Sequence, residues 1–312
     1  MTELPLRQPP VEESRGLLYF TDGTLAYAGH YIHEERHPEH THSFVEIAVV
    51  VGGQGQHRSL SGCQELRIGD VVVLRPGVWH GYERCRGLDL YNCCFSTELL
   101  RRELAWMQED PLLGYLLWSG PFAMQRRGLL TSRLESDALR DCVEHLEALD
   151  RLRSLPIGLH RGDIIGRLAL LLSALARAVD QGREGTSTPA GPTHPAVITA
   201  MRMMEAAPAY KWTLTELAQR LHLAPGYLIR LFKSATGLPP MAYLSRFRVE
   251  TAAEMLLHTD QPVTQIGTSV GWPDQNYFAR RFKAHYGLAA STYRARFSHT
   301  AVHLQSWPAT HH

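Results

Sequence analysis

Cysteine is scarce in this 312-residue chain, and its five cysteines are not spaced as a metal site or a disulfide framework would be. Cys93 and Cys94 are adjacent and would point to opposite faces of a strand, and no two cysteines form a CxxC pair. This usage argues against a zinc ribbon and against a disulfide-stapled secreted fold. It favours a reducing compartment, so we expect a cytoplasmic protein.

Long apolar runs are also missing. The longest stretch, from Leu168 to Ala176, is interrupted by Ser173. A membrane-spanning helix needs about 20 apolar residues, so this stretch is far too short. The N-terminal segment MTELPLRQPPVEESRG lacks the hydrophobic region of a signal peptide. We therefore expect a soluble protein with no membrane partner.

The chain has little net charge, but the charge is unevenly distributed. The formal net charge is +1, yet residues 196–298 hold 12 Lys+Arg against 6 Asp+Glu, a net of +6. Residues 1–195 hold 20 against 25, a net of −5. A basic C-terminal module after an acidic N-terminal one suits a chain whose C-terminal part meets phosphate.

Hydrophobic periodicity predicts an α+β fold with at least two domains. Val45–Val51 and Gly69–Leu74 are β-branched runs that end at Gly or Pro, as short strands of a barrel or sandwich do. From about Thr131, apolar residues recur every three or four positions, which predicts an antiparallel helical pair broken at Leu155–Gly158. Gly182–Pro192 has the composition of a flexible linker. The remainder is predicted to be helical to about Phe297.

A pattern occurs twice in the basic region, about fifty residues apart. The first copy starts at Leu214 and ends at Gly237, and the second starts at Val263 and ends at Gly287. The matching pairs are Leu217 with Ile266, Ala218 with Gly267, Leu221 with Val270, Tyr227 with Tyr277, Leu228 with Phe278, Arg230 with Arg280, Phe232 with Phe282, and Lys233 with Lys283. A short helix, a turn and a longer basic helix form the helix-turn-helix unit that reads DNA. Two units in one chain predict contact with two successive major grooves of double-stranded DNA.

Capping signals and apolar spacing indicate which residues face the groove. Thr213 and Glu216 form a capping box, Pro225 suits the first position of a helix, and Asp274 suits a cap. The tyrosines at 227 and 277 are expected to pack inward with Leu228, Phe278 and their apolar neighbours. The predicted DNA-binding residues, which remain on the outer faces, are Gly226, Ile229, Arg230 and Lys233 in the first unit and Gln275, Asn276, Arg280 and Lys283 in the second. Arg suits guanine, Gln or Asn suits adenine, and Lys suits phosphate.

These C-terminal residues resemble the AraC family of bacterial transcription regulators. The resemblance covers about Pro195 to Phe297 and includes F-K-x-x-x-G, the helix with Arg246 and Arg248, I-G-x-x-V-G-W-x-x-x-x-Y-F-x-R-x-F-K, and a closing Tyr293-Arg294. The sequence departs from the family pattern at Ala224, Gly267, Trp272 and Ala290. Ala224 replaces a capping Ser, a loss that typically costs about 1 kcal/mol. The resemblance implies a ligand-responsive regulator with no enzymatic activity.

Histidines in the N-terminal half resemble the two cupin motifs. They are His40-x-His42-x-x-x-Glu46 and Pro76-Gly77-x-x-His80, although Arg84 stands where the second motif has Asn. In metal-binding cupins three His and one Glu converge inside the barrel, and such ligands suit Zn, Fe or Mn. The same residues also suit the lining of an organic effector site, or simply structural polar positions. We expect no bound cofactor and keep a metal held by His40, His42, Glu46 and His80 as the alternative.

The sequence of the N-terminal half is similar to that of the rhamnose-regulator branch of the family, and this resemblance implies a carbohydrate as the effector. The predicted effector-binding residues are His40, His42, Glu46, Trp79, His80 and Tyr82. Aromatic rings such as Trp79, Tyr82 and Tyr91 can stack on a sugar, although core packing is their commoner role. The family implies a homodimer, and RNA polymerase as a partner if the protein activates transcription. A second hypothesis is a metal-dependent cupin enzyme with a DNA-binding appendage.

The predicted organisation combines these signals. Its segments are an N-terminal cupin-like β-barrel that binds the effector (15–130), a dimerisation helix pair (131–182), a linker (183–194), an all-α DNA-binding domain (195–297) with helix-turn-helix motifs at 214–236 and 263–286, and a disordered tail (298–312). Effector binding is expected to change how the helix pair and the linker present the two DNA-reading units.

Overall fold

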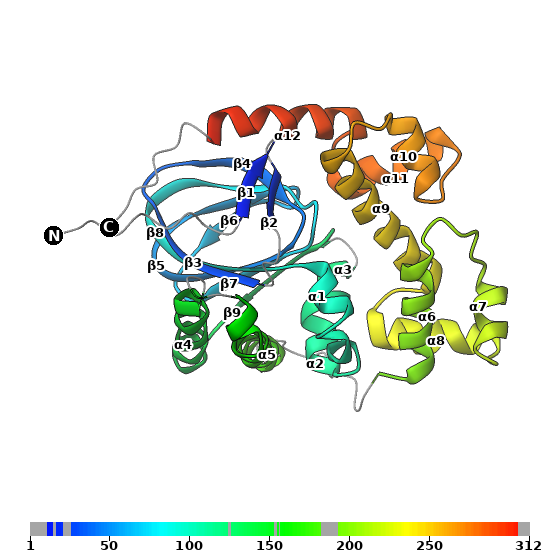
Figure 1. Cartoon of the computed structure of the whole chain (residues 1–312), viewed down its shortest axis with the longest axis horizontal. Helices are drawn as coiled ribbons and strands as arrows, with labels where there is room; N and C mark the ends of the chain where they lie inside the picture. The colour runs from blue at the N-terminus through cyan, green and yellow to red at the C-terminus, as the bar shows by residue number, and fades with distance from the viewer. Residues whose placement is uncertain are drawn as a thin grey trace.

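The computed structural model describes residues 11–14, 17–20, 26–123, 126–152, 155, 157–181 and 193–304. Within these ranges, side chains are described from residue 26 to residue 297, except for those of residues 157 and 158. The predicted linker and the last eight residues therefore lie almost entirely outside the described part. Figure 1 shows a curved sheet domain on one side, helices below it, and a separate helical domain beside it.

Among the described residues, nine strands form the sheet domain. They are β1 (Val11–Ser14), β2 (Leu17–Phe20), β3 (Ala26–His33), β4 (His37–His42), β5 (Val45–Ser59), β6 (Gly62–Leu66), β7 (Asp70–Leu74), β8 (His80–Phe95) and β9 (Leu129–Arg133). The order is β1-β2-β4-β8-β5-β7-β9, with β3 paired to β8 and β6 paired to β5. All pairs are antiparallel except β2 with β4. The long strands β5 and β8 are the centre of the sheet and carry most of its pairing.

Helices cover one side of the sheet domain. Five short elements come first: α1 (Thr97–Arg101), η1 (Ala105–Gln108), α2 (Pro111–Gly114), η2 (Tyr115–Ser119) and α3 (Gly120–Phe122). The helix pair α4 (Ser136–Leu152) and α5 (Ile157–Gln181) follows. The predicted helical region began at 131, but residues 129–133 form strand β9 against β7. That part is a strand because its backbone groups complete the edge of β7, a tertiary pairing that local periodicity does not show.

The C-terminal domain is all helical. It contains α6 (Pro195–Ala206), α7 (Leu214–Arg220), α8 (Pro225–Thr236), α9 (Pro240–His258), α10 (Val263–Ser269), α11 (Gln275–Tyr286) and α12 (Ala290–Leu304). The last helix extends past the boundary predicted at 297, and in Figure 1 it lies across the top of the sheet domain. No helix in the described ranges has the length and apolar character needed to cross a membrane.

The hydrophobic core does not stop at the domain boundary. One cluster of buried residues runs from strands β5 and β7 through α4 and α5 to Leu217, Leu228 and Phe232 of the first helix-turn-helix unit. A second cluster combines α9–α12 with Trp79 of the sheet domain. The sensor and the DNA-reading domain are therefore packed against each other through apolar contacts at both units.

The candidate nucleic-acid interface and the interior histidine cluster

The first DNA-reading unit is built from local capping signals. Thr213 caps α7 by accepting a hydrogen bond from the Glu216 backbone N–H at 3.1 Å. Helix α8 begins at Pro225 and has no side-chain cap at Ala224. It ends at Gly237, whose φ of 73° is a left-handed conformation that favours glycine. The Thr213 cap and the missing cap at Ala224 are confirmed, whereas the Glu216 carboxylate, the other half of the predicted capping box, accepts from the Tyr210 hydroxyl and from Arg220.

The second unit is built in the same way, but its longer helix begins with a side-chain cap. Asp274 caps α11 by accepting from the N–H groups of Asn276 and Tyr277, at 2.9 and 3.1 Å. The helix ends at Gly287, which has the same φ of 73° as Gly237. Helix α11 therefore has a side-chain cap that α8 lacks, as expected from the sequence.

The predicted reading residues lie on the open faces of α8 and α11. Seven of the eight are exposed, and Ile229 is half-buried; the exposed ones are Gly226, Arg230, Lys233, Gln275, Asn276, Arg280 and Lys283. Opposite them Leu228, Phe232, Phe278 and Phe282 are buried. The helices thus present a polar, cationic face to solvent and anchor themselves by their apolar residues.

Two residues were placed on the wrong side by sequence reasoning. Tyr227 and Tyr277 were expected to pack inward, but they are 41% and 40% exposed. Arg230 lies over the Tyr227 ring at 5.7 Å, and Arg281 lies over the Tyr277 ring at 5.9 Å. Each tyrosine sits in the first turn of its helix, where the ring covers the helix surface without entering the core. Both tyrosines belong to the open face. The sequence signal for this was that they occupy equivalent positions in the two copies of the repeat.

Helix α9 fixes the two units relative to each other. Its 19 residues span about 28 Å. Arg248, which is buried, donates to the carbonyls of Pro208 and Tyr210 at 2.7 and 2.8 Å. Arg281 of α11 donates to the Ser245 hydroxyl at 2.6 Å. The first bonds tie α9 to the loop before α7, and the second ties it to the second reading helix.

Strands β4, β5 and β8 bring six polar side chains together inside the sheet domain. This interior cluster consists of His40, His42, Glu46, His57, His80 and Tyr82, all 4% exposed or less. The rings of His40 and His80 are 4.3 Å apart, and the His57 and Tyr82 rings are 5.6 Å apart. Five of the six were predicted effector-binding residues, and His57 was not. His57 joins them because β5 pairs with β8 and places it opposite Tyr82.

Several buried polar atoms of the interior cluster have no hydrogen-bond partner. Among the described residues, these atoms are Nε2 of His42, Oε1 of Glu46, Nε2 of His57, both ring nitrogens of His80, and the Tyr82 hydroxyl. Such atoms cost about 1–3 kcal/mol each, so a native chain rarely leaves six together. These atoms make the interior cluster the candidate ligand-binding site of the sheet domain.

Burial keeps the interior cluster uncharged. It lowers the pKa of His42 to about 3 and of His57 to about 4, and it raises the pKa of Glu46 to about 8. Glu46 lies 3.7 Å from Nε2 of His42 and 3.8 Å from Nε2 of His80. At neutral pH these close approaches join neutral imidazoles to a largely protonated carboxyl, so they are not ion pairs.

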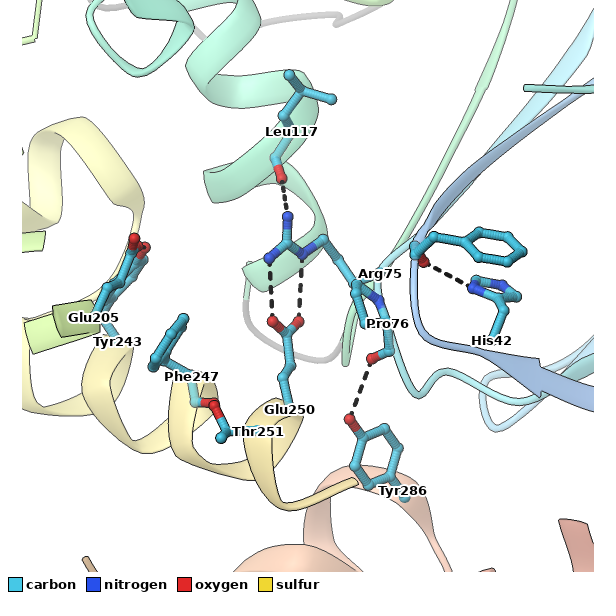
Figure 2. Close-up of polar contacts among 11 residues, drawn as sticks. His42, Arg75, Pro76, Leu117, Glu205, Tyr243, Phe247, Glu250, Thr251 and Tyr286 are labelled. Carbon is cyan, nitrogen blue, oxygen red and sulfur yellow. Dashed lines mark hydrogen bonds and ion pairs between the residues drawn. The ribbon is translucent and has the colours of Figure 1, made fainter. Parts of the chain in front are cut away.

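The donor set also fits a metal ion. One ligand atom each of His40, Glu46 and His80 lies within 4.8 Å of the others, and all three residues are buried. Two imidazoles and a carboxylate suit a first-row transition metal, with Glu46 bound as the carboxylate. His42, the fourth predicted ligand, lies outside this group of three: its Nδ1 donates to the Phe44 carbonyl at 2.8 Å (Figure 2), and its Nε2 faces Glu46 at 3.7 Å.

Trp79, the remaining predicted effector residue, is not part of the interior cluster. Its indole Nε1 donates to the Tyr286 carbonyl at 3.0 Å, and Arg296 lies over its ring at 5.4 Å. Sequence reasoning placed it beside His80 because the two are neighbours. Their side chains point to opposite sides of the chain, which puts Trp79 against the DNA-reading domain.

Comparison with known proteins gives a family for both halves. The AraC-like ligand binding domain matches residues 23–186, and a helix-turn-helix domain matches residues 217–296. The chain belongs to the AraC family. It is a DNA-binding transcription regulator with an N-terminal ligand-binding domain, and not a cupin enzyme that carries a DNA-binding appendage.

Two relatives and two solved structures are similar to this chain. The transcriptional activator RhaR of Yersinia pestis is 25% identical over 297 residues, which cover 95% of this chain and 98% of the relative. RhaR of Pectobacterium carotovorum is 26% identical over 269 residues, 84% and 89% of the two chains. ToxT from Vibrio cholerae is 12% identical with a TM-score of 0.49, covering 87% of this chain and 98% of that one. The C-terminal domain of AraT from Geobacillus stearothermophilus is 32% identical over 33% of this chain and 87% of that one, with a TM-score of 0.33.

In this AraC-family chain the sensor and DNA-reading domains share a buried ion pair that sequence reasoning missed. Arg75 donates to both carboxylate oxygens of Glu250 on α9, at 3.3 and 3.1 Å, and to the Leu117 carbonyl at 3.2 Å. Figure 2 shows this fork at the meeting point of the two domains. The adjoining cleft is lined by Arg101, Trp118, Glu205, Phe247 and Glu254, among others. The 175-residue separation of Arg75 and Glu250 left no local pattern to find.

Proposed function

We propose that this regulator responds to a small polar molecule held by the interior cluster, and that a carbohydrate is that molecule. The observation that carries the proposal is the set of buried polar atoms without partners. A sugar hydroxyl both donates and accepts, so it suits neutral imidazoles, a protonated carboxyl and a phenol in one site. The likeness to RhaR relatives over 95% of the chain supports the carbohydrate class.

The ring contacts limit how this molecule binds. Neighbouring rings of the interior cluster lie 4.3 to 5.8 Å apart, so a sugar must push strands β4 and β8 apart to enter. A metal ion at His40, Glu46 and His80 would need no such opening. Metal analysis of untagged protein therefore tests the competing occupant. If the protein holds near-stoichiometric Zn, Fe or Mn, the ligand of the interior cluster is a metal ion and not a sugar.

The eight exposed or half-exposed predicted residues of α8 and α11 are proposed to contact DNA, with Tyr227 and Tyr277 added to them. The length of α9, about 28 Å, is close to the ~34 Å between successive major-groove faces of DNA. The second unit offers Gln275, Asn276 and Arg280, which is the richer set for base reading. We propose that it discriminates between sequences while the first unit mainly anchors.

We propose that the protein is a homodimer that uses helix α5. Leu170 on this helix is 53% exposed, and Leu159, which precedes a kink at His160, is 80% exposed. Between them Gly162 and Gly166 have open space where a side chain would be, so another helix can approach closely. With the RhaR relatives named activators, we further propose activation through RNA polymerase, in the cytoplasm where bacterial DNA lies. The predicted segment limits, 15–130, 131–182, 183–194 and 195–297, are kept as the proposed domain boundaries with two changes: strand β9 moves the end of the sheet domain to 133, and helix α12 extends the DNA-reading domain to 304.

Thermal shift with a panel of sugars and sugar acids tests the effector site. A ligand at 100 times its Kd adds about 2.7 kcal/mol of stability. Tyr82→Phe removes a buried hydroxyl that has no partner in the described part of the chain, so the ligand-free variant should be as stable as the parent. The same variant should bind the active sugar about 2- to 10-fold more weakly, as loss of one neutral hydrogen bond predicts. Unchanged affinity, measured by calorimetry, would remove Tyr82 from the site.

A further inference from the structure

Residues Thr41–His42 and Pro76–His80 form a layer one residue thick between the interior cluster and the DNA-reading domain, which is called the relay wall below. We infer that the relay wall couples the interior cluster to the DNA-reading domain, so that a change at His42 or His80 repositions the second DNA-reading helix. The inference builds on the proposed function of the interior cluster and names its regulatory route. It replaces the earlier expectation that the helix pair and linker carry the signal.

The inner face of the relay wall belongs to the interior cluster. His42 and His80 are fully buried, and their rings are 5.4 Å apart. A backbone bond from the Gly77 N–H to the His42 carbonyl, 2.9 Å long, ties the two halves of the wall together. Any molecule that separates these two rings must therefore strain or move the backbone from Pro76 to Trp79.

The outer face of the relay wall is bonded to the second unit. Successive residues of an extended chain point to opposite sides, so Thr41 and Trp79 face away from their neighbours His42 and His80. The Thr41 hydroxyl lies 3.2 Å from the Tyr293 hydroxyl, and Trp79 donates to the Tyr286 carbonyl. The Tyr293 hydroxyl also donates to the Gly77 carbonyl at 2.7 Å.

A fourth contact is visible in Figure 2, where the Tyr286 hydroxyl points to the Pro76 carbonyl, 3.3 Å away. Gly77 has a φ of +79°, and a Cβ built there would lie 2.6 Å from the Tyr286 hydroxyl and 2.9 Å from the Ala253 Cβ. The relay wall is thus in direct contact with helices α9 and α11, and no free space remains between them at Gly77. Close-packed groups transmit a displacement instead of absorbing it.

The contacts end at the part of the molecule that reads DNA. Tyr286 is the last residue of α11, three residues after Lys283 and six after Arg280, and Tyr293 belongs to α12. The reading face itself stays exposed, so the relay wall does not cover it. The first unit is held by a different part of the sensor, because Leu228 and Phe232 of α8 share a buried apolar cluster with Leu117 of η2. Movement of the wall therefore acts directly on the second unit and not on the first.

Hydrogen exchange on the full-length protein tests the relay wall without a ligand or DNA. Tyr286→Phe removes one hydroxyl bond to the wall and Tyr293→Phe removes two. We expect about tenfold faster exchange in residues 286–297 when both changes are combined. Tyr243→Phe is the matched control. It removes a buried tyrosine hydroxyl that donates to Glu205 inside the DNA-reading domain, and it should leave residues 286–297 unchanged.

A double-mutant cycle then measures the coupling. His80→Asn changes the inner face, and we expect it to alter exchange in residues 286–297 at least threefold when the wall contacts are intact. In the Tyr286→Phe, Tyr293→Phe background the same change should have less than half that effect. Equal effects in both backgrounds, or no effect in either, would overturn the relay. If His80→Asn unfolds the chain, His42→Asn takes its place in the cycle.

The relay and the effector proposal fail in different experiments. A sugar panel that gives no thermal shift in the parent protein counts against the carbohydrate effector, and the exchange cycle still decides the relay. If a sugar such as L-rhamnose does bind, it should change the DNA affinity of the parent at least fivefold. It should still bind the double phenylalanine variant but change its DNA affinity less than twofold. An equal change of DNA affinity in both proteins would also overturn the relay.

Discussion

The buried ion pair of Arg75 and Glu250 gives the sharpest test of how the two domains are joined. Their side chains are 6% and 7% exposed, and the shorter N–O distance is 3.1 Å. At an effective dielectric constant of about 20, opposite charges at this distance attract by about 5 kcal/mol. Burial raises the pKa of the Glu250 carboxyl in spite of Arg75. The free-energy cost of desolvating this carboxylate therefore cancels much of the attraction.

Glu250→Gln keeps the shape of the side chain and leaves the arginine charge buried without a counter-charge. We expect a loss of about 3–5 kcal/mol in the free energy of unfolding or undocking, as for other broken buried pairs. Because the pair joins two domains, urea unfolding should change from one cooperative transition to two, with the DNA-reading domain separating first. Circular dichroism and tryptophan fluorescence would then report midpoints that no longer coincide.

Two controls show whether the loss comes from the unpaired charge. Glu254→Gln, an exposed carboxylate one turn along α9, should change stability by less than about 0.5 kcal/mol. The double change of Arg75→Met with Glu250→Leu removes both charges and should recover most of the stability. If Glu250→Gln alone stays within about 1 kcal/mol of the parent protein, the pair does not hold the domains together and the reasoning is wrong.

Three further outcomes are expected. The pKa of the Glu46 carboxyl is about 8 in the folded chain and near 4.5 in the unfolded chain. The free energy of unfolding, measured by urea titration, should therefore fall by about 1.4 kcal/mol from pH 7 to pH 9, and Glu46→Gln should lack this pH dependence. Arg280→Ala should cost about 1–3 kcal/mol of DNA affinity and relax sequence preference in anisotropy assays, whereas Lys283→Ala should weaken all sequences alike and reduce the salt dependence by about one phosphate. Should both variants keep parental affinity, α11 does not read DNA. Leu170→Lys should dissociate the dimer in analytical ultracentrifugation without unfolding the chain, and a parental sedimentation coefficient would move the interface elsewhere.

Local signals along the sequence predicted the DNA-reading half almost in full. Caps at Thr213 and Asp274 and the glycines that end α8 and α11 act within one helical turn, so they can be read from neighbouring residues. The repeat and its buried stripe give the same helices twice. The tyrosines at 227 and 277 went wrong because a ring in the first turn of a helix can cover the surface or enter the core, and spacing alone does not distinguish these two fates.

The sensor half was predicted in part. The β-branched runs indicated its strands, and the histidine motifs gave five of the six members of the interior cluster. His57 was missed because only the pairing of β5 with β8 places it opposite Tyr82. Residues 129–133 were assigned to the helical region because a strand that completes a sheet edge depends on its partner. Trp79 was assigned to the wrong side because its orientation is set by contact with Tyr286.

The sequence by itself determined the repeated DNA-reading unit, its cationic outer face and the polar residues that meet inside the sensor. These features depend on side-chain periodicity and on interactions between residues a few positions apart. Tertiary structure alone decided that Arg75 meets Glu250 and that a wall one residue thick separates the interior cluster from the second unit. Both require segments about 175 to 250 residues apart to pack together, and such packing is a property of the whole folded chain.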